Sequence, residues 1–600
     1  MILETLKENF KNIVVFDFEF TQDIDEKGER AAPLCAVYKE IKSGKYYRCM
    51  GDDLKKLPFN AKETLFVPFN AVAEASCFMS LGIKLPKYWW DVFVENKKLY
   101  LGKIPQTRGA FGLVRTAQRY QIEGMSEGLK KWNIDQILKN NPDYTPEMML
   151  DYCQSDVDTT EKVFYAQLKD LEETFRNKGP MEIIQHALFH GRSMAVVAEV
   201  EHNGIPIDDL LYEEINKRFP ILKEKMINDI NSRLDIYEAG TFSNAKFKKL
   251  VKREGLLDQW PTTPSGALSL TEKVIYDFSQ INDAISEYYL MKEFVDSQKL
   301  KGFIVGPDKR ARTKLNMFGI KTGRTNQSTS RYPFNAAKPM RNIIKPNQNW
   351  GLIYSDYKSQ EIAIAAYLSK DQNLISAYES GDPYIYAAQM AGSVPKDATK
   401  QSHPKERNLY KVVLLATLYG QGSKSLAARL NISVDEAVKI IADIKNVFST
   451  YFEWITGIVN RAMVRGYITT KFGWRYWIGK QEKINPRTLF NFPIQAHGSE
   501  MLRHAMLGLV DKGIELSALI HDGLMIHAPL SKINDAEAKV KSIMENASRI
   551  VLDGDVCPVE MQLIKTNYKQ GKEEQIKFDR IVSIIRSSNI STSSISSTQV

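Results

Sequence analysis

Two aspartates far apart in the chain, Asp356 and Asp522, each follow an apolar run. Residues 351–357 are typical of a short buried strand, and Asp-Gly between two apolar runs predicts a hairpin with Asp522 at its tip. Such a hairpin alone indicates only a turn. Two carboxylates that converge on one point repel each other unless cations lie between them, and magnesium ions favour oxygen ligands. The pair therefore indicates a two-metal site for phosphoryl transfer.

A predicted helix with a cationic face lies between the two aspartates. Arg407, Lys411, Leu415 and Tyr419 follow one another at steps of four, so they share one broad helix face. Two cations one turn apart suit a triphosphate, whereas Arg407 and Lys411 taken alone are also typical of a solvated basic face. The apolar remainder of the segment indicates that this helix packs against the protein.

A second set of carboxylates lies near the N-terminus. Asp17 and Glu19 alternate with three phenylalanines, so a strand would place both carboxylates on one face. Tyr152 and Asp156 lie one helical turn apart later in the chain and can share a face. The wet face of an edge strand is the alternative interpretation of the first segment.

Basic residues are concentrated in residues 309–345, where no acidic residue occurs. Such a segment is typical of a polyanion-binding surface, and a basic loop without a partner is the alternative. The ten basic residues are Lys309, Arg310, Arg312, Lys314, Lys321, Arg324, Arg331, Lys338, Arg341 and Lys345.

Together these segments resemble the family A DNA polymerases, in the order and spacing of that family's motifs. Asp356 with Glu361 resembles the first palm motif, the Arg407 helix the fingers motif, and His521 with Asp522 the second palm motif. The resemblance covers most of residues 190–575. Further matches are Thr322, Gly323 and Arg324 before the first motif, and Arg487, Asn491, Pro493 and Gln495 before the last.

The resemblance implies a template-directed DNA polymerase that binds deoxynucleoside triphosphates and primer-template DNA. Asp356 and Asp522 would bind two Mg2+ ions, and Lys411 would donate a proton to the leaving pyrophosphate. Glu361 would exclude the ribose 2′-hydroxyl. The remaining nucleotide contacts implied are Arg407, Leu415, Tyr419 and His521, and the DNA contacts implied are Arg324, Arg341, Arg487, Asn491 and Gln495.

The N-terminal carboxylates resemble the DEDD exonuclease, in its tyrosine-bearing form, that precedes the polymerase in this family. Asp17, Glu19, Glu74 and Asp156 would hold two metal ions, and Tyr152 would orient the attacking water for 3′ to 5′ removal of nucleotides. Glu74 stands where an aspartate is expected, four residues after Asn70. We therefore expect exonuclease activity that is slower than typical, or else that Asp91 supplies the ligand instead.

Two departures from the family pattern concern the polymerase motifs. Gly523 stands where a glutamate usually follows His-Asp, and Leu415 stands where an aromatic residue usually faces the incoming sugar. Two aspartates suffice for two metal ions, so we expect activity to survive. Leucine keeps the apolar contact but lacks a flat ring.

The predicted fold class is α/β and multidomain, with an RNase H-like 3′-5′ exonuclease domain followed by a right-hand polymerase. A polar stretch with two helix breakers near residue 180 indicates the first boundary. The expected domains are exonuclease 1–185, thumb 186–320, palm 321–370 and 485–580, fingers 371–484, and a low-complexity disordered tail 581–600.

The bulk composition is that of a soluble globular protein. The 600 residues carry a net charge of +9 and are 43% hydrophobic, and no apolar run approaches the ~18 residues that span a bilayer. The five cysteines show no metal-ligand spacing. We expect a cytoplasmic monomer without a membrane partner. Because the predicted exonuclease strand begins within the first 20 residues, we expect no room for the optional 5′ nuclease domain before it. This layout favours a phage enzyme that acts in a bacterial host. The sequence does not indicate its replisome partners.

Two rival functions remain open from the sequence. A single-subunit RNA polymerase shares the palm aspartates and the fingers lysine and tyrosine, but Glu361 and the N-terminal carboxylates argue against it. A non-catalytic DNA-binding or scaffolding protein is favoured only by the substitutions at Glu74 and Gly523.

Overall fold

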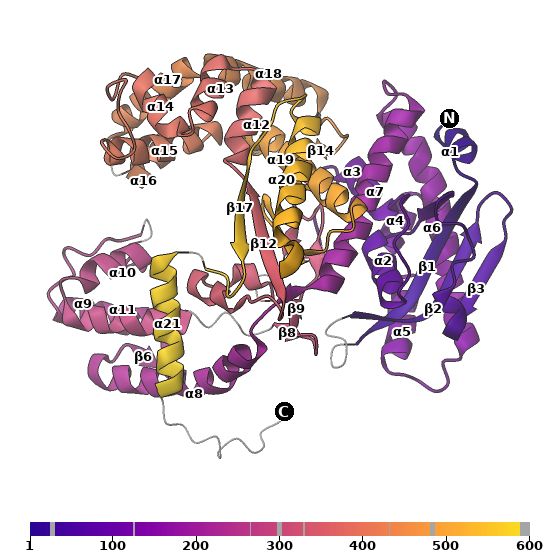
Figure 1. The fold of residues 1–600 in the computed structure, drawn as a ribbon, viewed down its shortest axis with the longest axis horizontal. Helices are drawn as coiled ribbons and strands as arrows, with labels where there is room; N and C mark the ends of the chain where they lie inside the picture. Colours follow the sequence, from indigo (N-terminus) through magenta and orange to yellow (C-terminus); the bar gives the residue numbers. More distant parts are fainter. Residues whose placement is uncertain are drawn as a thin grey trace. The chain divides into compact units, whose positions relative to one another are not determined.

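The computed structural model describes residues 1–23, 30–107, 109–123, 126–263, 266–296, 303–327, 331–430, 432–479, 486–569 and 571–587. The chain divides into two compact units, the first made of residues 1–204, 314–327 and 352–563 and the second of residues 205–313, 328–351 and 564–600. Both helices and sheets build the chain (Figure 1), which confirms the α/β multidomain class. None of the described helices is long and apolar enough to cross a membrane.

The first unit begins with a mixed four-stranded sheet. Its strand order is β3 (Tyr46–Met50), β2 (Arg30–Glu40), β1 (Asn12–Asp23) and β4 (Thr64–Val67), with β1 antiparallel to β2 and parallel to β4. The helices of this region are α1 (Ile2–Asn9), η1 (Gly51–Lys55), α2 (Ala71–Ser80), α3 (Val92–Tyr100), α4 (Leu113–Arg119), α5 (Glu127–Leu138), α6 (Pro146–Thr174) and α7 (Pro180–Asn203).

Side chains of β1 alternate between the two faces of this sheet, as predicted. Phe16 and Phe18 pack in an aromatic cluster with Phe78 of α2. Ile13 and Val15 pack on the other face in a core that includes residues of α6. Because α6 covers the face that carries Ile13 and Val15, the carboxylates farther along that face of β1 point toward α6.

A second four-stranded sheet follows in the order β15 (Leu516–Ile520), β16 (Gly523–Pro529), β12 (Trp350–Tyr357) and β17 (Val559–Ile564). Helices α19 (Pro486–Asp511) and α20 (Ile533–Val551) pack against each other beside it (Figure 1). A helical region connects β12 to α19. It comprises α12 (Gln360–Ser369), α13 (Gln372–Glu379), α14 (Pro383–Met390), α15 (Pro404–Leu418), α16 (Ser423–Leu430), α17 (Val434–Val447) and α18 (Ser449–Arg465).

Short elements complete the first unit. These are the ribbon of β10 (Leu315–Asn316) and β11 (Asn326–Gln327), the hairpin of β13 (Tyr467–Thr469) and β14 (Arg475–Trp477), and η4 (Leu530–Lys532).

The β13–β14 hairpin lies against the loop after α3. Trp477 donates its backbone N–H to the carbonyl of Leu101 at 2.8 Å. A Cβ on Gly102 would lie only 2.0 Å from the carbonyl oxygen of Trp477. Lys103 Nζ lies 3.6 Å from the centroid of the Trp477 ring. The two segments therefore approach closely enough that only glycine fits at residue 102.

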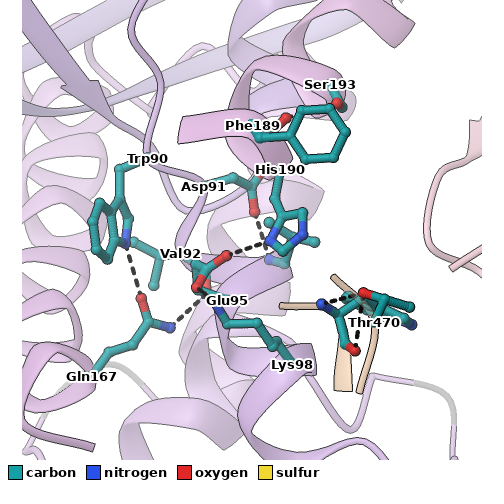
Figure 2. Close-up of polar contacts among 12 residues, drawn as sticks. Trp90, Asp91, Val92, Glu95, Lys98, Gln167, Phe189, His190, Ser193 and Thr470 are labelled. Carbon is teal, nitrogen blue, oxygen red and sulfur yellow. Dashed lines mark hydrogen bonds and ion pairs between the residues drawn. The ribbon is translucent and has the colours of Figure 1, made fainter. Parts of the chain in front are cut away.

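Helices α3 and α7 enclose a buried group of charges (Figure 2). Glu95 Oε1 lies 2.9 Å from His190 Nδ1, and Lys98 forms an ion pair with the same carboxylate. All three side chains are at most 1% exposed. Burial lowers the pKa of His190 to about 4 despite its bond to Glu95, so the ring is neutral at pH 7. Burial alone would raise the pKa of Glu95, but Lys98 and His190 outweigh it and lower the pKa to about 2.

The second unit is mainly helical. Its largest helix, α8 (Asp209–Leu234), packs with α21 (Lys572–Ser587) and α11 (Asp283–Asp296), and Phe219 stacks on Phe294 with ring centroids 4.6 Å apart. The other elements are β5 (Ile205–Pro206), β6 (Tyr237–Glu238), β7 (Thr241–Phe242), α9 (Asn244–Arg253), α10 (Glu272–Ser279), β8 (Ile304–Val305), β9 (Arg310–Arg312), η2 (Pro333–Asn335) and η3 (Lys338–Ile343). Residues 581–587 of the expected tail belong to α21, and residues 588–600 lie outside the described residues.

Candidate active sites

The predicted hairpin at Asp522 is confirmed, with its turn one residue earlier than Asp-Gly suggests. Strands β15 and β16 are antiparallel, and Ile520 pairs with Gly523. His521 and Asp522 therefore form the turn, and His521 adopts a left-handed backbone with φ 48°. A two-residue hairpin turn demands positive φ, which a polar residue such as histidine adopts more readily than a β-branched one.

Asp356 is the next-to-last residue of the neighbouring strand β12. Beside it, Ser355 Oγ donates a hydrogen bond to the carbonyl of Leu524 at 3.2 Å. Asp356 Oδ2 accepts a hydrogen bond from Tyr354 at 3.3 Å, while Oδ1 is buried and has no hydrogen-bond partner among the described residues. Burial, and next the Asp522 carboxylate, raise the pKa of Asp356 to about 7. Two adjacent carboxylates with an unsatisfied buried oxygen are a donor set that suits a hard divalent cation.

Gly523 packs tightly between these strands. A Cβ at this residue would lie 2.7 Å from the carbonyl oxygen of Ser355 and 3.4 Å from Asp356 Oδ1. This crowding gives a physical reason for the departure noted in the sequence, because any side chain here would push β16 away from β12.

Glu361 lies near Asp522 and pairs with Arg324. Glu361 lies in the first turn of α12, and Arg324 Nη2 donates a hydrogen bond to its Oε1 at 3.1 Å. Burial raises the pKa of Glu361 despite Arg324, and the Asp522 charge adds to the rise. Helix α19 also contacts the segment that carries Arg324. Arg503 of this helix donates a hydrogen bond to the carbonyl of Gly323 at 2.8 Å.

The cationic helix is α15, which confirms the predicted helix from Arg407 onward. Lys411 is exposed and Arg407, Leu415 and Tyr419 are half-buried, whereas most other residues of its second half are buried. Arg407 forms an ion pair with Asp382, the N-cap of α14. Arg407, Lys411, Leu415 and Tyr419 therefore lie on the less buried face of the helix.

The predicted DNA contacts occur in both units. Arg487, Asn491 and Gln495 lie on α19, and Arg487 lines a cavity of about 430 Å3 together with Gly420 and Phe490. Arg341 belongs to η3 in the second unit.

The N-terminal carboxylates meet between β1 and α6. Asp17 and Glu19 on β1 and Cys153 on α6 place one ligand atom each within 4.8 Å of one another. Cys153 Sγ lies 3.8 Å from Asp17 Oδ2 and 3.3 Å from the Asp17 carbonyl oxygen. Burial, and next the charge of Asp156, raise the pKa of Asp17 to about 7. Asp17, Glu19 and Asp156 thus form one acidic group with the oxygen donors that a divalent cation requires.

Glu74, not Asp91, is directed at this group. Burial and the Asp17 charge raise the pKa of Glu74, and its buried Oε2 has no hydrogen-bond partner among the described residues. Asp91 instead accepts backbone hydrogen bonds from Ala71 at 2.7 Å and Val94 at 2.6 Å. Both oxygens of Asp91 join the first turns of α2 and α3, so Glu74 is the better placed of the two candidate ligands.

Tyr152 and Asp156 are both buried on α6, one turn apart as predicted. Lys130 of α5 forms an ion pair with Asp156, and its Nζ lies 5.8 Å from the centroid of the Tyr152 ring. Lys130 and Cys153 were missed from the sequence. Cys153 adjoins Tyr152 on a predicted helix, which was a usable signal, whereas no local pattern distinguishes Lys130 from Lys131.

Comparisons with known proteins agree on one family. A family model described as "DNA polymerase family A" matches residues 210–569. The "DNA polymerase I" of Aquifex aeolicus is 25% identical over 408 residues, which cover 65% of this chain and 67% of that protein. A "DNA polymerase I, thermostable" of Thermus thermophilus is 25% identical over 389 residues. The matched region covers 59% of this chain but only 44% of that relative's length.

One solved structure covers almost the whole chain. It is described as "POL domain of Pol1 from M. smegmatis complex with DNA primer-template and dNTP", and it superposes with a TM-score of 0.67 over 94% of this chain and 97% of that one. The sequence identity is 18%, so this likeness concerns the fold.

Proposed function

The chain belongs to DNA polymerase family A, and we propose that it is a template-directed DNA polymerase that adds deoxynucleotides to a primer 3′ end. The observation that carries the proposal is the meeting of Asp356 and Asp522, two carboxylates far apart in sequence. The solved neighbour holds primer-template DNA and a deoxynucleoside triphosphate, which supports the same substrates here.

Asp356 and Asp522 would hold two Mg2+ ions, which activate the primer hydroxyl and stabilise the leaving oxygen when bound. The unsatisfied Oδ1 of Asp356 supports this donor role. Lys411 and Arg407 would bind the triphosphate, and Lys411 would donate a proton to pyrophosphate. Because Arg407 is already paired with Asp382, Lys411 is the more available of the two cations.

The Glu361 carboxylate would exclude the ribose 2′-hydroxyl. Its hydrogen bond to Arg324 supports this role, because a paired carboxylate is held in one position. Tyr419 and Leu415 would line the nascent base pair and sugar, and His521 would contact the nucleotide from the hairpin turn. The DNA contacts proposed are Arg324, Arg341, Arg487, Asn491 and Gln495.

A second activity is favoured by the acidic group between β1 and α6. We propose that Asp17, Glu19, Glu74 and Asp156 hold two divalent ions and that Tyr152 orients water for 3′ to 5′ removal of nucleotides. The proposed organisation places an RNase H-like exonuclease in residues 1–185, a thumb in 186–320, a discontinuous palm in 321–370 and 485–580, and fingers in 371–484. Proofreading during phage replication, as a cytoplasmic monomer, is the setting we propose.

Primer extension with single-site variants tests both activities. Asp356→Ala should abolish template-dependent extension and leave degradation of single-stranded DNA intact, whereas Asp17→Ala should do the reverse, so each variant is the folding control of the other. Extension that survives Asp356→Ala would refute the polymerase site. Equal use of ribonucleotides and deoxynucleotides would instead support a single-subunit RNA polymerase, and a failure of both activities in the unaltered protein would support a DNA-binding scaffold.

A further inference from the structure

Lys130 brings a fixed positive charge to the proposed exonuclease carboxylates. Its ammonium forms an ion pair with Asp156, whose side chain is 5% exposed, and its own side chain is 29% exposed. The ammonium therefore pairs with a carboxylate oxygen that a bound metal ion would use.

The carboxylates of the proposed polymerase site meet a different environment. Asp356 accepts a hydrogen bond from the Tyr354 hydroxyl, and its other oxygen has no hydrogen-bond partner among the described residues. Among the residues that the structure describes, no lysine or arginine forms an ion pair with Asp356 or Asp522, whereas Asp156 has one in Lys130. A cation that binds Asp356 need only displace a neutral hydroxyl.

We propose that Lys130 is a tethered competitor for divalent cations, so that the exonuclease site needs a higher concentration of free metal ion than the polymerase site of the same chain. A cation that binds the Asp156 oxygen must displace the ammonium, because both are positive and both use the same lone pairs. The balance between extension and degradation then depends on free Mg2+. This inference rests on the proposed exonuclease function and concerns the same carboxylates.

Metal binding tests the inference without relying on turnover. Asp356→Asn and Asp522→Asn together remove the polymerase carboxylates, and Mn2+ binding to the full chain is then measured by titration calorimetry and electron paramagnetic resonance. In this background Lys130→Met should bind Mn2+ about three- to tenfold more tightly, the size expected for loss of a partly exposed competing charge pair. Lys131→Met is the matched control, because Lys131 is the exposed neighbour on the same helix, and it should change nothing.

Activity gives a second measure in the unaltered background. The Mg2+ concentration at half-maximal degradation should fall by the same factor in Lys130→Met, while that for extension should not move. Unchanged or weaker Mn2+ binding in Lys130→Met, in a protein with the parental unfolding temperature, would overturn the inference. If the unaltered protein shows no degradation that depends on Asp17, the proposed exonuclease activity is refuted. The Mn2+ titration would still decide the role of Lys130 in that case.

Discussion

Glu95→Gln should be among the most destabilising single substitutions in the N-terminal region, although it removes only one charge. The Glu95 and Lys98 side chains are 0% and 1% exposed, so the substitution leaves a buried ammonium without its carboxylate. Losing one partner of a buried pair costs about 3–5 kcal/mol. Lys98 can avoid an unpaired buried charge only by releasing its proton. For a group whose ordinary pKa is about 10.4, this costs about 4.6 kcal/mol at pH 7. Both routes give a loss near 4 kcal/mol.

The companion variants separate charge from packing. Lys98→Met leaves Glu95 with only His190, and protonating that carboxylate at pH 7 costs about 3.7 kcal/mol at most. The double variant Glu95→Gln, Lys98→Met leaves no unpaired charge, so it should cost less than either single change. A double-mutant cycle should therefore give a coupling energy of at least about 3 kcal/mol.

Differential scanning calorimetry measures the effect through the transition of the N-terminal region. For a cooperative unit of roughly 200 residues, 4 kcal/mol corresponds to a fall of about 8–15 °C in Tm. Circular dichroism should show that each variant still folds at low temperature. A Glu95→Gln variant within about 1 kcal/mol of the parent protein, or a double variant whose loss equals the sum of the singles, would refute the reasoning.

Three further substitutions have defined outcomes. Burial lowers the pKa of His190 to about 4, so as pH falls the unfolded chain binds a proton at this histidine before the folded chain does. The folded state therefore loses stability as pH falls from about 6.5 toward 4. Between pH 7 and 5, urea unfolding should show a loss about 2 kcal/mol larger in the parent protein than in His190→Phe. Gly523→Ala should slow extension at least about tenfold without affecting degradation, because its Cβ would lie 2.7 Å from the Ser355 carbonyl; an unchanged extension rate would contradict the crowding. Leu415→Phe should raise the single-turnover addition rate and the error frequency together, and no change in either would refute a trade of rate for selectivity.

Local patterns were enough to predict the elements that carry the polymerase carboxylates. The apolar run before Asp356 and the paired runs around Asp522 predict β12 and the β15–β16 hairpin, because strand and turn propensities act over a few residues. The position of the turn was less predictable. The register between β15 and β16 places His521 and Asp522 in the turn and Gly523 in the strand. The close approach of β12 favours glycine at residue 523, and this contact between distant segments is not visible in the local sequence.

Contacts that depend on tertiary packing were not predictable from local spacing. Asp91 and Glu74 were both candidate ligands, and only the meeting of α2 and α3 shows that Asp91 caps backbone N–H groups. Lys130 reaches Asp156 from another helix, across 26 positions of sequence. Long side chains on different helices meet through packing, which the sequence periodicity of either helix alone does not describe.

The loop after α3 and the β13–β14 hairpin fit each other so closely that their sequences must match. Gly102 admits no side chain against Trp477, and Trp477 in turn bonds to Leu101 and carries Lys103 on its ring. A chimera that takes the N-terminal region from one relative and the remainder from another would separate these matched surfaces. Recombination between relatives should therefore succeed only where residues 101–103 and 467–477 are inherited together.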